Sequence, residues 1–239
     1  MESIMDKNLN NFYANLIKAI NRNVLGKITD SYDILVIANL HAAFESANYY
    51  CKNMNKAANY ENDLSLLQHA LEIRKKEGLI LEFGVASGRT INHISSLVTQ
   101  TVYGFDVFTG LPETWRTGFF SGVFGREKLP LVNKNVELVV GLFEDTLDEF
   151  LRKNREPISL LHVDCDLYGG TKTIFNKLGD LIQPGTIIVF DEYFNYPGWS
   201  QHEFRAFQEF VESKKIKYRY DSFVSKHQQV CVVIESINC

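Results

Sequence analysis

Carboxylates gathered behind two apolar runs are the side chains whose spacing points most directly to chemistry. Asp164 and Asp166 follow the apolar run 158–163, and Asp191 and Glu192 follow a second apolar run. If both runs are strands of a parallel sheet, these side chains converge beyond the carboxyl ends of neighbouring strands, where such sheets bind ligands. Asp164, Asp191 and Glu192 would repel one another unless a cation joins them. All-oxygen ligation favours a hard divalent ion, Mg²⁺ first, with Ca²⁺ or Mn²⁺ as substitutes.

A structural interpretation of the same carboxylates stays open. Buried acids also occur without a ligand, hydrogen-bonded to loop backbone or paired with Arg and Lys. The sequence is therefore compatible with two interpretations of this acidic group: a metal site, or a set of structural carboxylates that anchor the loops.

A second candidate site is the stretch 79–90, which passes from an apolar run through two glycines into a helical pattern. An unbroken apolar run of this kind is typical of a strand buried on both faces. Gly84 and Gly88 let the backbone turn and come close to a ligand. Ser87 and Thr90 are candidate caps for the helix that follows, whose free N–H groups would face the same ligand. The stretch predicts a nucleotide-type binding turn, with an ordinary ligand-free strand-turn-helix as the alternative.

The spacing of this turn argues against a dinucleotide. The dinucleotide fingerprint G-x-G-x-x-G brings the backbone against a pyrophosphate, whereas Gly84 and Gly88 are spaced G-x-x-x-G. Glu82 at the strand end would repel a phosphate and attract a cationic amino group. The pattern resembles motif I of class I S-adenosylmethionine-dependent methyltransferases. The resemblance implies that S-adenosylmethionine binds at Glu82, Gly84, Ser87, Gly88, Arg89 and Thr90.

Two further residues are expected at this cofactor. Asp106 ends the predicted strand 101–106 and lies 18 residues after Gly88, close to where nucleotide-binding units place the carboxylate that accepts hydrogen bonds from the ribose hydroxyls. Phe143 follows the predicted strand 136–140 and could lie on an adenine face. A Gly-rich and aromatic loop, 108–135, is long enough to act as a lid.

The rest of the chain predicts one α/β architecture. Strands and helices alternate after residue 79, which indicates a doubly wound, mostly parallel, Rossmann-like methyltransferase sheet. The predicted strands are seven, at 79–83, 101–106, 136–140, 158–163, 186–190, 218–222 and 230–235. Helices are expected at 90–98, 171–182 and 202–214, and a further one follows 141–145 and ends near Lys153. Two β runs without an intervening helix predict a terminal hairpin. Residues 1–76 carry helical periodicity and form an expected N-terminal helical extension or lid, which leaves 77–239 as the cofactor-binding domain.

Four motifs together resemble the macrocin O-methyltransferase family, whose members methylate sugar hydroxyls. They are Glu82-Phe-Gly-Val-Ala-Ser-Gly88, Phe105-Asp-Val-Phe-Thr-Gly-Leu-Pro112, His162-Val-Asp-Cys-Asp-Leu-Tyr168 and Asp191-Glu-Tyr193, in this order along the chain. The resemblance implies that Asp164, Asp191 and Glu192 match the family's metal carboxylates, although the family usually has aspartate at the third. It also implies a histidine base after the second strand, and this chain has no histidine between His93 and His162.

The expected reaction is therefore methyl transfer to a hydroxyl of a small molecule, such as a sugar or a natural-product diol or catechol. A bound metal lowers the pKa of a coordinated hydroxyl, and a vicinal diol or catechol can chelate. The catalytic residues are expected to be Asp164, together with Asp166 or His202 as the base. For His202, helix capping or surface exposure is the competing interpretation.

Composition excludes several classes of partner. A net charge of −4 with interspersed acidic and basic residues offers no basic stripe for nucleic acid. No apolar run is long enough to span a bilayer, and residues 1–11 lack a signal-peptide core, so a cytoplasmic protein is expected. Four scattered cysteines indicate neither a zinc site nor a disulfide framework. Apolar and aromatic residues in the N-terminal helices predict a homo-oligomer, most simply a dimer.

Two other functions remain as alternatives from the sequence. One is a non-catalytic S-adenosylmethionine-binding module that keeps the fold without turnover. The other is an NAD-linked oxidoreductase, against which the G-x-x-x-G spacing and the terminal hairpin argue.

Overall fold

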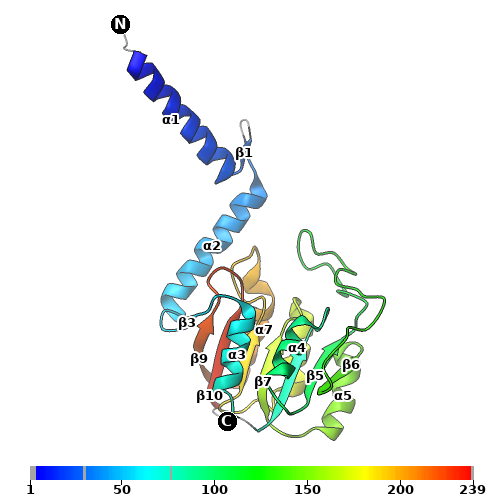
Figure 1. Cartoon of the computed structure of the whole chain (residues 1–239). Helices are drawn as coiled ribbons and strands as arrows, with labels where there is room; N and C mark the ends of the chain where they lie inside the picture. Colours follow the sequence, from blue (N-terminus) through cyan, green and yellow to red (C-terminus); the bar gives the residue numbers. More distant parts are fainter. Residues whose placement is uncertain (1–3, 29–30, 76, 238–239) are drawn as a thin grey trace.

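The molecule is built around a single eight-stranded sheet, seen in a computed structural model that describes residues 4–28, 31–75 and 77–237 (Figure 1). Five strands run parallel: β4 (Leu79–Phe83), β5 (Val102–Asp106), β6 (Val136–Val140), β7 (Ile158–Val163) and β8 (Ile187–Phe190). Every residue of β4, β7 and β8 is buried, because helices cover both faces of the sheet. The predicted doubly wound sheet is confirmed.

The sheet ends in the predicted hairpin. β9 (Ile216–Phe223) and β10 (Val230–Ile237) pair antiparallel, and β10 also pairs antiparallel with β8. The strand order is β3-β9-β10-β8-β7-β4-β5-β6. The seven expected strands are all present, and the eighth is β3 (Ala58–Asn59), a two-residue strand parallel to β9.

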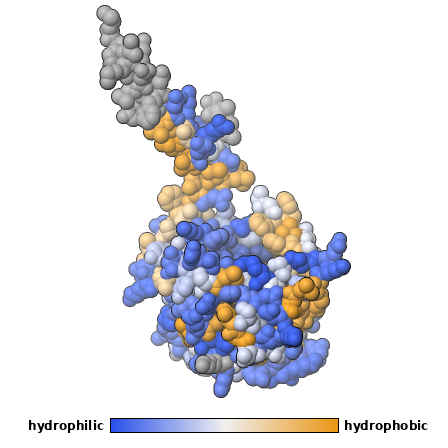
Figure 2. Space-filling model, in the orientation of Figure 1, coloured by the Kyte–Doolittle hydropathy of each residue, from blue (hydrophilic) through white to orange (hydrophobic). Residues whose placement is uncertain are grey.

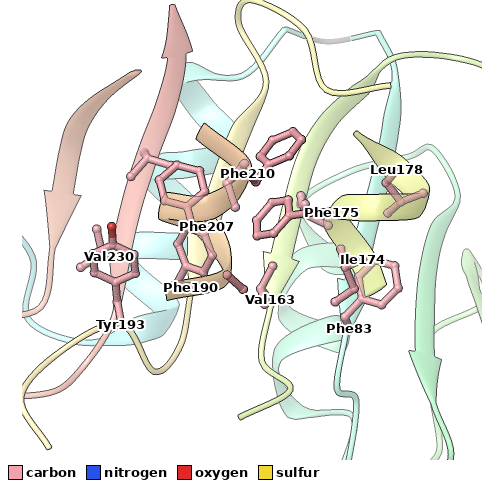
Figure 3. Packing of buried hydrophobic residues seen from close by; sticks show 14 of the residues in the cluster. Phe83, Val163, Ile174, Phe175, Leu178, Phe190, Tyr193, Phe207, Phe210 and Val230 are labelled. Atoms are coloured by element: carbon pink, nitrogen blue, oxygen red, sulfur yellow. The ribbon is translucent and has the colours of Figure 1, made fainter. Parts of the chain in front are cut away.

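Helices on the two faces enclose two separate apolar cores. α3 (Asp63–Ile73) and α4 (Arg89–Ser96) cover one face with Leu66, Ile91 and their neighbours. α5 (Phe143–Lys153), α6 (Tyr168–Leu178) and α7 (Glu203–Ser213) cover the other, which is rich in aromatic rings. Figure 3 shows Phe175 of α6 and Phe207 of α7 packed against Phe190 of β8, while Phe210 of α7 stacks on Phe175. These cores fix the strand ends relative to one another.

Two helices before this unit form an arm that projects from it (Figure 1). α1 (Ile4–Asn23) and α2 (Ile34–Asn53) are joined by a short ladder of β1 (Lys27–Ile28) and β2 (Ser31–Tyr32). The predicted N-terminal helical extension, residues 1–76, therefore contains α1 and α2 of the arm and also α3, which packs on the sheet. Many apolar side chains of the arm are exposed to solvent, and Figure 2 shows orange, hydrophobic residues along it. The exposed apolar residues are Leu16, Ile17, Ile20, Val24, Ile34, Leu35, Ile37 and Phe44. The dimer and the division at residue 76 stay predictions.

The carboxyl end of α2 is tied to the loop after β8. Ser46 Oγ accepts a hydrogen bond of 2.8 Å from the Asn195 backbone N–H, and the hydroxyls of Tyr49 and Tyr220 lie 2.5 Å apart. Among the described residues, no helix is long and apolar enough to cross a membrane.

Candidate active site

A cavity of about 430 Å³ opens at the carboxyl ends of the parallel strands. The loops after β4, β5, β6, β7 and β8 all contribute to its wall, and residues of the segment 107–124 form one side. The residues lining it that matter for chemistry are Gly84, Ala86, Asp106, Arg116, Phe143, Asp164, Asp166, Asp191 and Glu192. The structure therefore brings the predicted cofactor turn and the predicted acidic group to one cavity.

The first glycine of the turn is required by a neighbouring strand end. Gly84 has φ +93°, and a Cβ built there would lie 1.6 Å from the carbonyl oxygen of Asp164. β4 and β7 are adjacent, and the Asp164 N–H donates to the Phe83 carbonyl at 2.8 Å. Gly84 is therefore required by the close approach of the Asp164 carbonyl, and it also lies in the cavity wall, where its approach to a ligand stays a prediction.

The helix after the turn starts without a side-chain cap. Gly88, in the left-handed region at φ +79°, is the N-cap residue of α4, and no side-chain oxygen accepts from the first turn. The expected caps are wrong: Ser87 is exposed, and Thr90 is buried with its hydroxyl donating to Glu82 Oε1 at 3.1 Å. Glycine takes this cap position because it adopts the left-handed conformation without a Cβ clash.

Asp106 organises the turn from the neighbouring strand. Its Oδ2 accepts from the backbone N–H groups of Val85 and Ala86 at 2.9 and 2.8 Å, and its Oδ1 accepts from Phe108 N–H at 2.7 Å. Asp106 also lines the cavity, and its contact with the ribose hydroxyls stays a prediction. Because each carboxylate oxygen has two lone pairs, acceptor capacity remains for a ligand.

The other side chains expected at the cofactor contact neighbouring protein groups instead of lining the cavity. Glu82 is fully buried, and its Oε2 accepts from His162 Nδ1 at 2.9 Å. Arg89 forms an ion pair with Asp63 of α3. Glu82, Ser87, Gly88, Arg89 and Thr90 are not among the residues that line the cavity, so from this turn the structure places Gly84 and the unforeseen Ala86 in its wall.

Phe143, predicted to lie on an adenine face, is in the cavity wall, and its contact with adenine stays a prediction. It is the first residue of α5, and its ring meets the Phe83 ring edge-on with centroids 5.1 Å apart. A Cβ on Gly170 would lie 3.3 Å from the Phe143 ring, so the glycine makes room for this aromatic side chain. Phe143 therefore offers a positioned apolar surface.

Two of the three predicted metal carboxylates lie together, joined by a histidine. Side-chain ligand atoms of His162, Asp164 and Asp191 all fall within 4.8 Å of one another, whereas Glu192 is outside this trio. His162 Nε2 and Glu192 Oε2 are buried without a hydrogen-bond partner in the described part of the chain. Gln229 Nε2 donates to Asp191 Oδ1 at 3.0 Å.

The electrostatics of this group follow from burial and repulsion. Burial, with the charges of Asp191 and Asp166, raises the pKa of Asp164 well above its usual range. Burial, with Asp191 and Asp164, does the same to the pKa of Glu192. Burial alone would lower the pKa of His162, but its hydrogen bond to Glu82 and the surrounding negative charge raise it. The group is thus short of positive charge.

A carboxylate that the sequence did not single out ties the two acidic loops together. Glu203, in the first turn of α7, is fully buried. Its Oε1 accepts from the Cys165 N–H at 3.3 Å and its Oε2 from the Glu192 N–H at 3.2 Å. One side chain therefore fixes the spacing between the loops after β7 and β8.

We expect Glu203→Ala to destabilise the fold by roughly 2–5 kcal/mol, because two buried N–H groups lose their acceptor. Urea unfolding measures this. Glu209→Ala is the matched control, since Glu209 is on the same helix but 38% exposed, where its carboxylate accepts from Tyr168, Lys172 and Arg205 rather than from buried backbone N–H groups. Equal losses in the two variants would show that Glu203 is not the tie between the loops.

The two predicted bases occupy different positions. Asp166 is buried, lines the cavity and has φ +63°, a conformation that costs energy in a residue other than glycine. Burial and Asp191 raise the pKa of Asp166 to about 7. His202 is the N-cap residue of α7 without a side-chain cap bond, and its ring lies 6.2 Å from that of Trp115. His202 is not among the cavity-lining residues, so the geometry favours Asp166.

Comparison with known families and structures agrees with this fold and cavity. Residues 81–193, just under half of the chain, match a family model described as a methyltransferase domain. No curated protein matches the sequence. Among solved structures, the O-methyltransferase NovP has a TM-score of 0.56 at 19% identity, over 72% of this chain and 79% of its own.

A calicheamicin methyltransferase, CalS11, has a TM-score of 0.54 at 18% identity and covers 98% of this chain and 94% of its own. At these identities the likeness concerns the fold. The matched region 81–193 holds all five parallel strand ends that border the cavity, so the similarity to methyltransferase domains covers the part of the fold that builds this site.

Proposed function

We propose that this protein transfers the methyl group of S-adenosylmethionine to a hydroxyl of a small molecule with the help of a divalent cation. The observation that carries the proposal is the single cavity in which the Gly84 turn, Asp106 and Phe143 face the acidic group at the ends of β7 and β8. A methyl donor bound along the turn would have its sulfonium beside carboxylates, which favour a positive charge.

The cofactor would lie across the ends of β4, β5 and β6. Asp106 would accept hydrogen bonds from the ribose hydroxyls, and Phe143 would cover one face of the adenine. Glu82, Arg89 and Thr90 would act on the cofactor only through the shape of the turn. Glu82 is hydrogen-bonded to His162 and Thr90, and Arg89 is paired with Asp63.

The side chains present fit a divalent cation. Buried carboxylates whose pKa values are raised by mutual repulsion, and the buried unpartnered atoms His162 Nε2 and Glu192 Oε2, are what such an ion would relieve. Asp164 and Asp191 would hold it, with Glu192 or His162 as a further ligand and Mg²⁺ as the first choice for oxygen donors. When bound, the ion lowers the pKa of a ligated hydroxyl and orients it.

Asp166 would take the proton from the acceptor hydroxyl. Its carboxyl group lies in the cavity wall, and a base works best when its pKa is near the operating pH. The acceptor class follows the fold relatives and the motif resemblance to macrocin O-methyltransferases: NovP is described as an O-methyltransferase, and CalS11 as acting on a rhamnose hydroxyl of a TDP-sugar. A sugar or another diol is therefore the proposed acceptor of this chain.

Cofactor binding is tested by calorimetry with S-adenosylmethionine and its demethylated product. Saturation at one hundred times the dissociation constant should raise stability by about 2.7 kcal/mol. Native mass spectrometry of the purified protein would show a retained cofactor and ion together. No heat and no melting shift at millimolar cofactor would refute the proposal, whereas cofactor binding without metal affinity or turnover would identify a non-catalytic binding module.

Phe143→Ala should weaken binding of the demethylated product roughly three- to tenfold, because an aromatic contact contributes about 0.5–1.5 kcal/mol beyond its buried area. Phe44→Ala is the control, since Phe44 is 70% exposed on α2. Calorimetric titration of both variants gives the comparison. Equal affinities in both variants would remove Phe143 from the cofactor site.

A further inference from the structure

Arg116 stands in the wall of the cavity as a cation held by aromatic rings. Its guanidinium carbon lies 3.9 Å from the ring centre of Trp115, 4.6 Å from that of Tyr196 and 4.7 Å from that of Phe119. Its Nε is buried and has no hydrogen-bond partner within the described segments. Three rings therefore fix the direction of the guanidinium while leaving hydrogen-bond donors unused.

Carboxylates share the cavity with Arg116 without pairing with it. Asp166 and Glu192 line the same wall, and their charges act on Arg116. Across residues 4–28, 31–75 and 77–237, no carboxylate oxygen lies within 4.0 Å of its nitrogen atoms. A cation that served only to neutralise the acidic group would be expected in contact with it. The guanidinium is instead oriented and free to bind an anion.

Two more cations of the same loop line an adjoining hollow. This second cavity, of about 810 Å³, is bordered by Ser87, Gly125, Arg126, Glu127 and Lys128, so two cations and one carboxylate line it, and it shares Ala86 and Phe124 with the first. Arg126 and Lys128 are exposed, and neither makes an ion pair with the rest of the described chain. The loop thus presents Arg116, Arg126 and Lys128 to two cavities that meet at the glycine turn.

We propose that Arg116 binds a phosphate group of the methyl acceptor, with Arg126 and Lys128 receiving its extension, so that the acceptor is a phosphorylated or diphosphate-linked small molecule. The planar guanidinium binds two phosphate oxygens at once. A single carboxylate would be satisfied by Arg116 alone, whereas three unpaired cations along two joined cavities fit a longer, more highly charged anion. The proposal rests on the proposed methyl transfer, since it names the acceptor's chemistry.

The test uses the full chain saturated with the demethylated cofactor product, in EDTA, titrated with inorganic pyrophosphate, inorganic phosphate and acetate. Tryptophan fluorescence is the readout, because Trp115 stacks on Arg116, and calorimetry checks it. We expect pyrophosphate to bind more tightly than phosphate, and acetate most weakly. Arg116→Met should weaken pyrophosphate binding at least about tenfold, as loss of a charge-assisted bidentate contact does.

Three variants complete the design. Arg152→Met, an exposed arginine of α5 with the same charge change, should leave the affinity unchanged. The double variant Arg126→Gln/Lys128→Gln should weaken pyrophosphate more than phosphate. Arg116→Lys keeps the charge without the planar fork and should give an intermediate affinity, which preserves the test if the methionine variant fails to fold.

Several results would overturn the proposal. These are no anion binding by the wild type, equal binding by wild type and Arg116→Met or Arg116→Lys, and a preference for acetate, which would assign a carboxylate ligand. Pyrophosphate binding that needs added Mg²⁺ and survives Arg116→Met would assign the anion to the metal. Titration of the demethylated cofactor without anion tests the proposed function separately, so the two failures are distinguishable.

Discussion

Asp164→Asn should lower methyl transfer on the order of 10²–10³-fold while changing affinity for the demethylated cofactor less than about twofold. The reason is positional. Asp164 belongs to the trio with His162 and Asp191 at the ends of β7 and β8, whereas Asp106 ends β5, on the other side of β4 in the sheet. Removing its charge should weaken cation binding without changing cofactor binding. Turnover, and calorimetry with Mn²⁺ and with the cofactor product, measure the two effects independently.

Stability separates this role from a structural one. Burial and neighbouring carboxylates raise the pKa of Asp164, so its ionised form is unfavourable in the folded, metal-free protein. Asp164→Asn should therefore leave the melting temperature in EDTA unchanged or higher, and should abolish the rise on adding Mg²⁺. Asp180→Asn, at an exposed pair with Lys214, is the control. A loss of about 1–3 kcal/mol with and without metal would show that Asp164 is a structural anchor.

The sheet could be predicted because its strands are buried on both faces and therefore appear as unbroken apolar runs. β3 could not, since two residues, Ala58 and Asn59, carry no periodicity. α6 was predicted to start at residue 171, yet it begins at Tyr168. Its first turn contains Gly169 and Gly170, and two glycines in a sequence favour a loop over a helix. In the structure Gly170 is helical and makes room for Phe143. Tertiary packing overrides local preference at this point.

The site was predictable as a location but less so as a set of contacts. The sequence places Glu82 in a strand, as β4 confirms, but only the register, which pairs Glu82 with His162 across β4 and β7, shows that its carboxylate faces the histidine. Glu203 carries no sequence signal, since an acid in the first turn of a helix is ordinary. The only sequence feature that could have singled out Arg116 is the number of aromatic residues near it in the loop. Which side chains face one another across elements is a tertiary property.

Gly84→Ala should destabilise the protein by at least about 3 kcal/mol and abolish cofactor binding, through a collision and a strained backbone together. The added Cβ would lie 1.6 Å from the Asp164 carbonyl oxygen and 2.6 Å from its carbon. Neither backbone can yield easily. The Gly84 N–H donates to Phe105 and the Asp164 N–H to Phe83, which lock β4 to both neighbours. Urea unfolding and calorimetry with the demethylated cofactor measure both losses.

Gly118→Ala isolates the part of this loss that comes from backbone conformation. Gly118 has φ +89°, close to that of Gly84, but a Cβ there would meet nothing within 4 Å. Only the strain of a positive φ remains, about 1–2 kcal/mol. A larger loss at Gly84 would show that its glycine is required by the approach of the Asp164 carbonyl, which sets the spacing between the cofactor turn and the acidic group. Equal losses in the two variants would instead mean that the turn needs glycine for its φ alone, and that β7 can move to accommodate a methyl group.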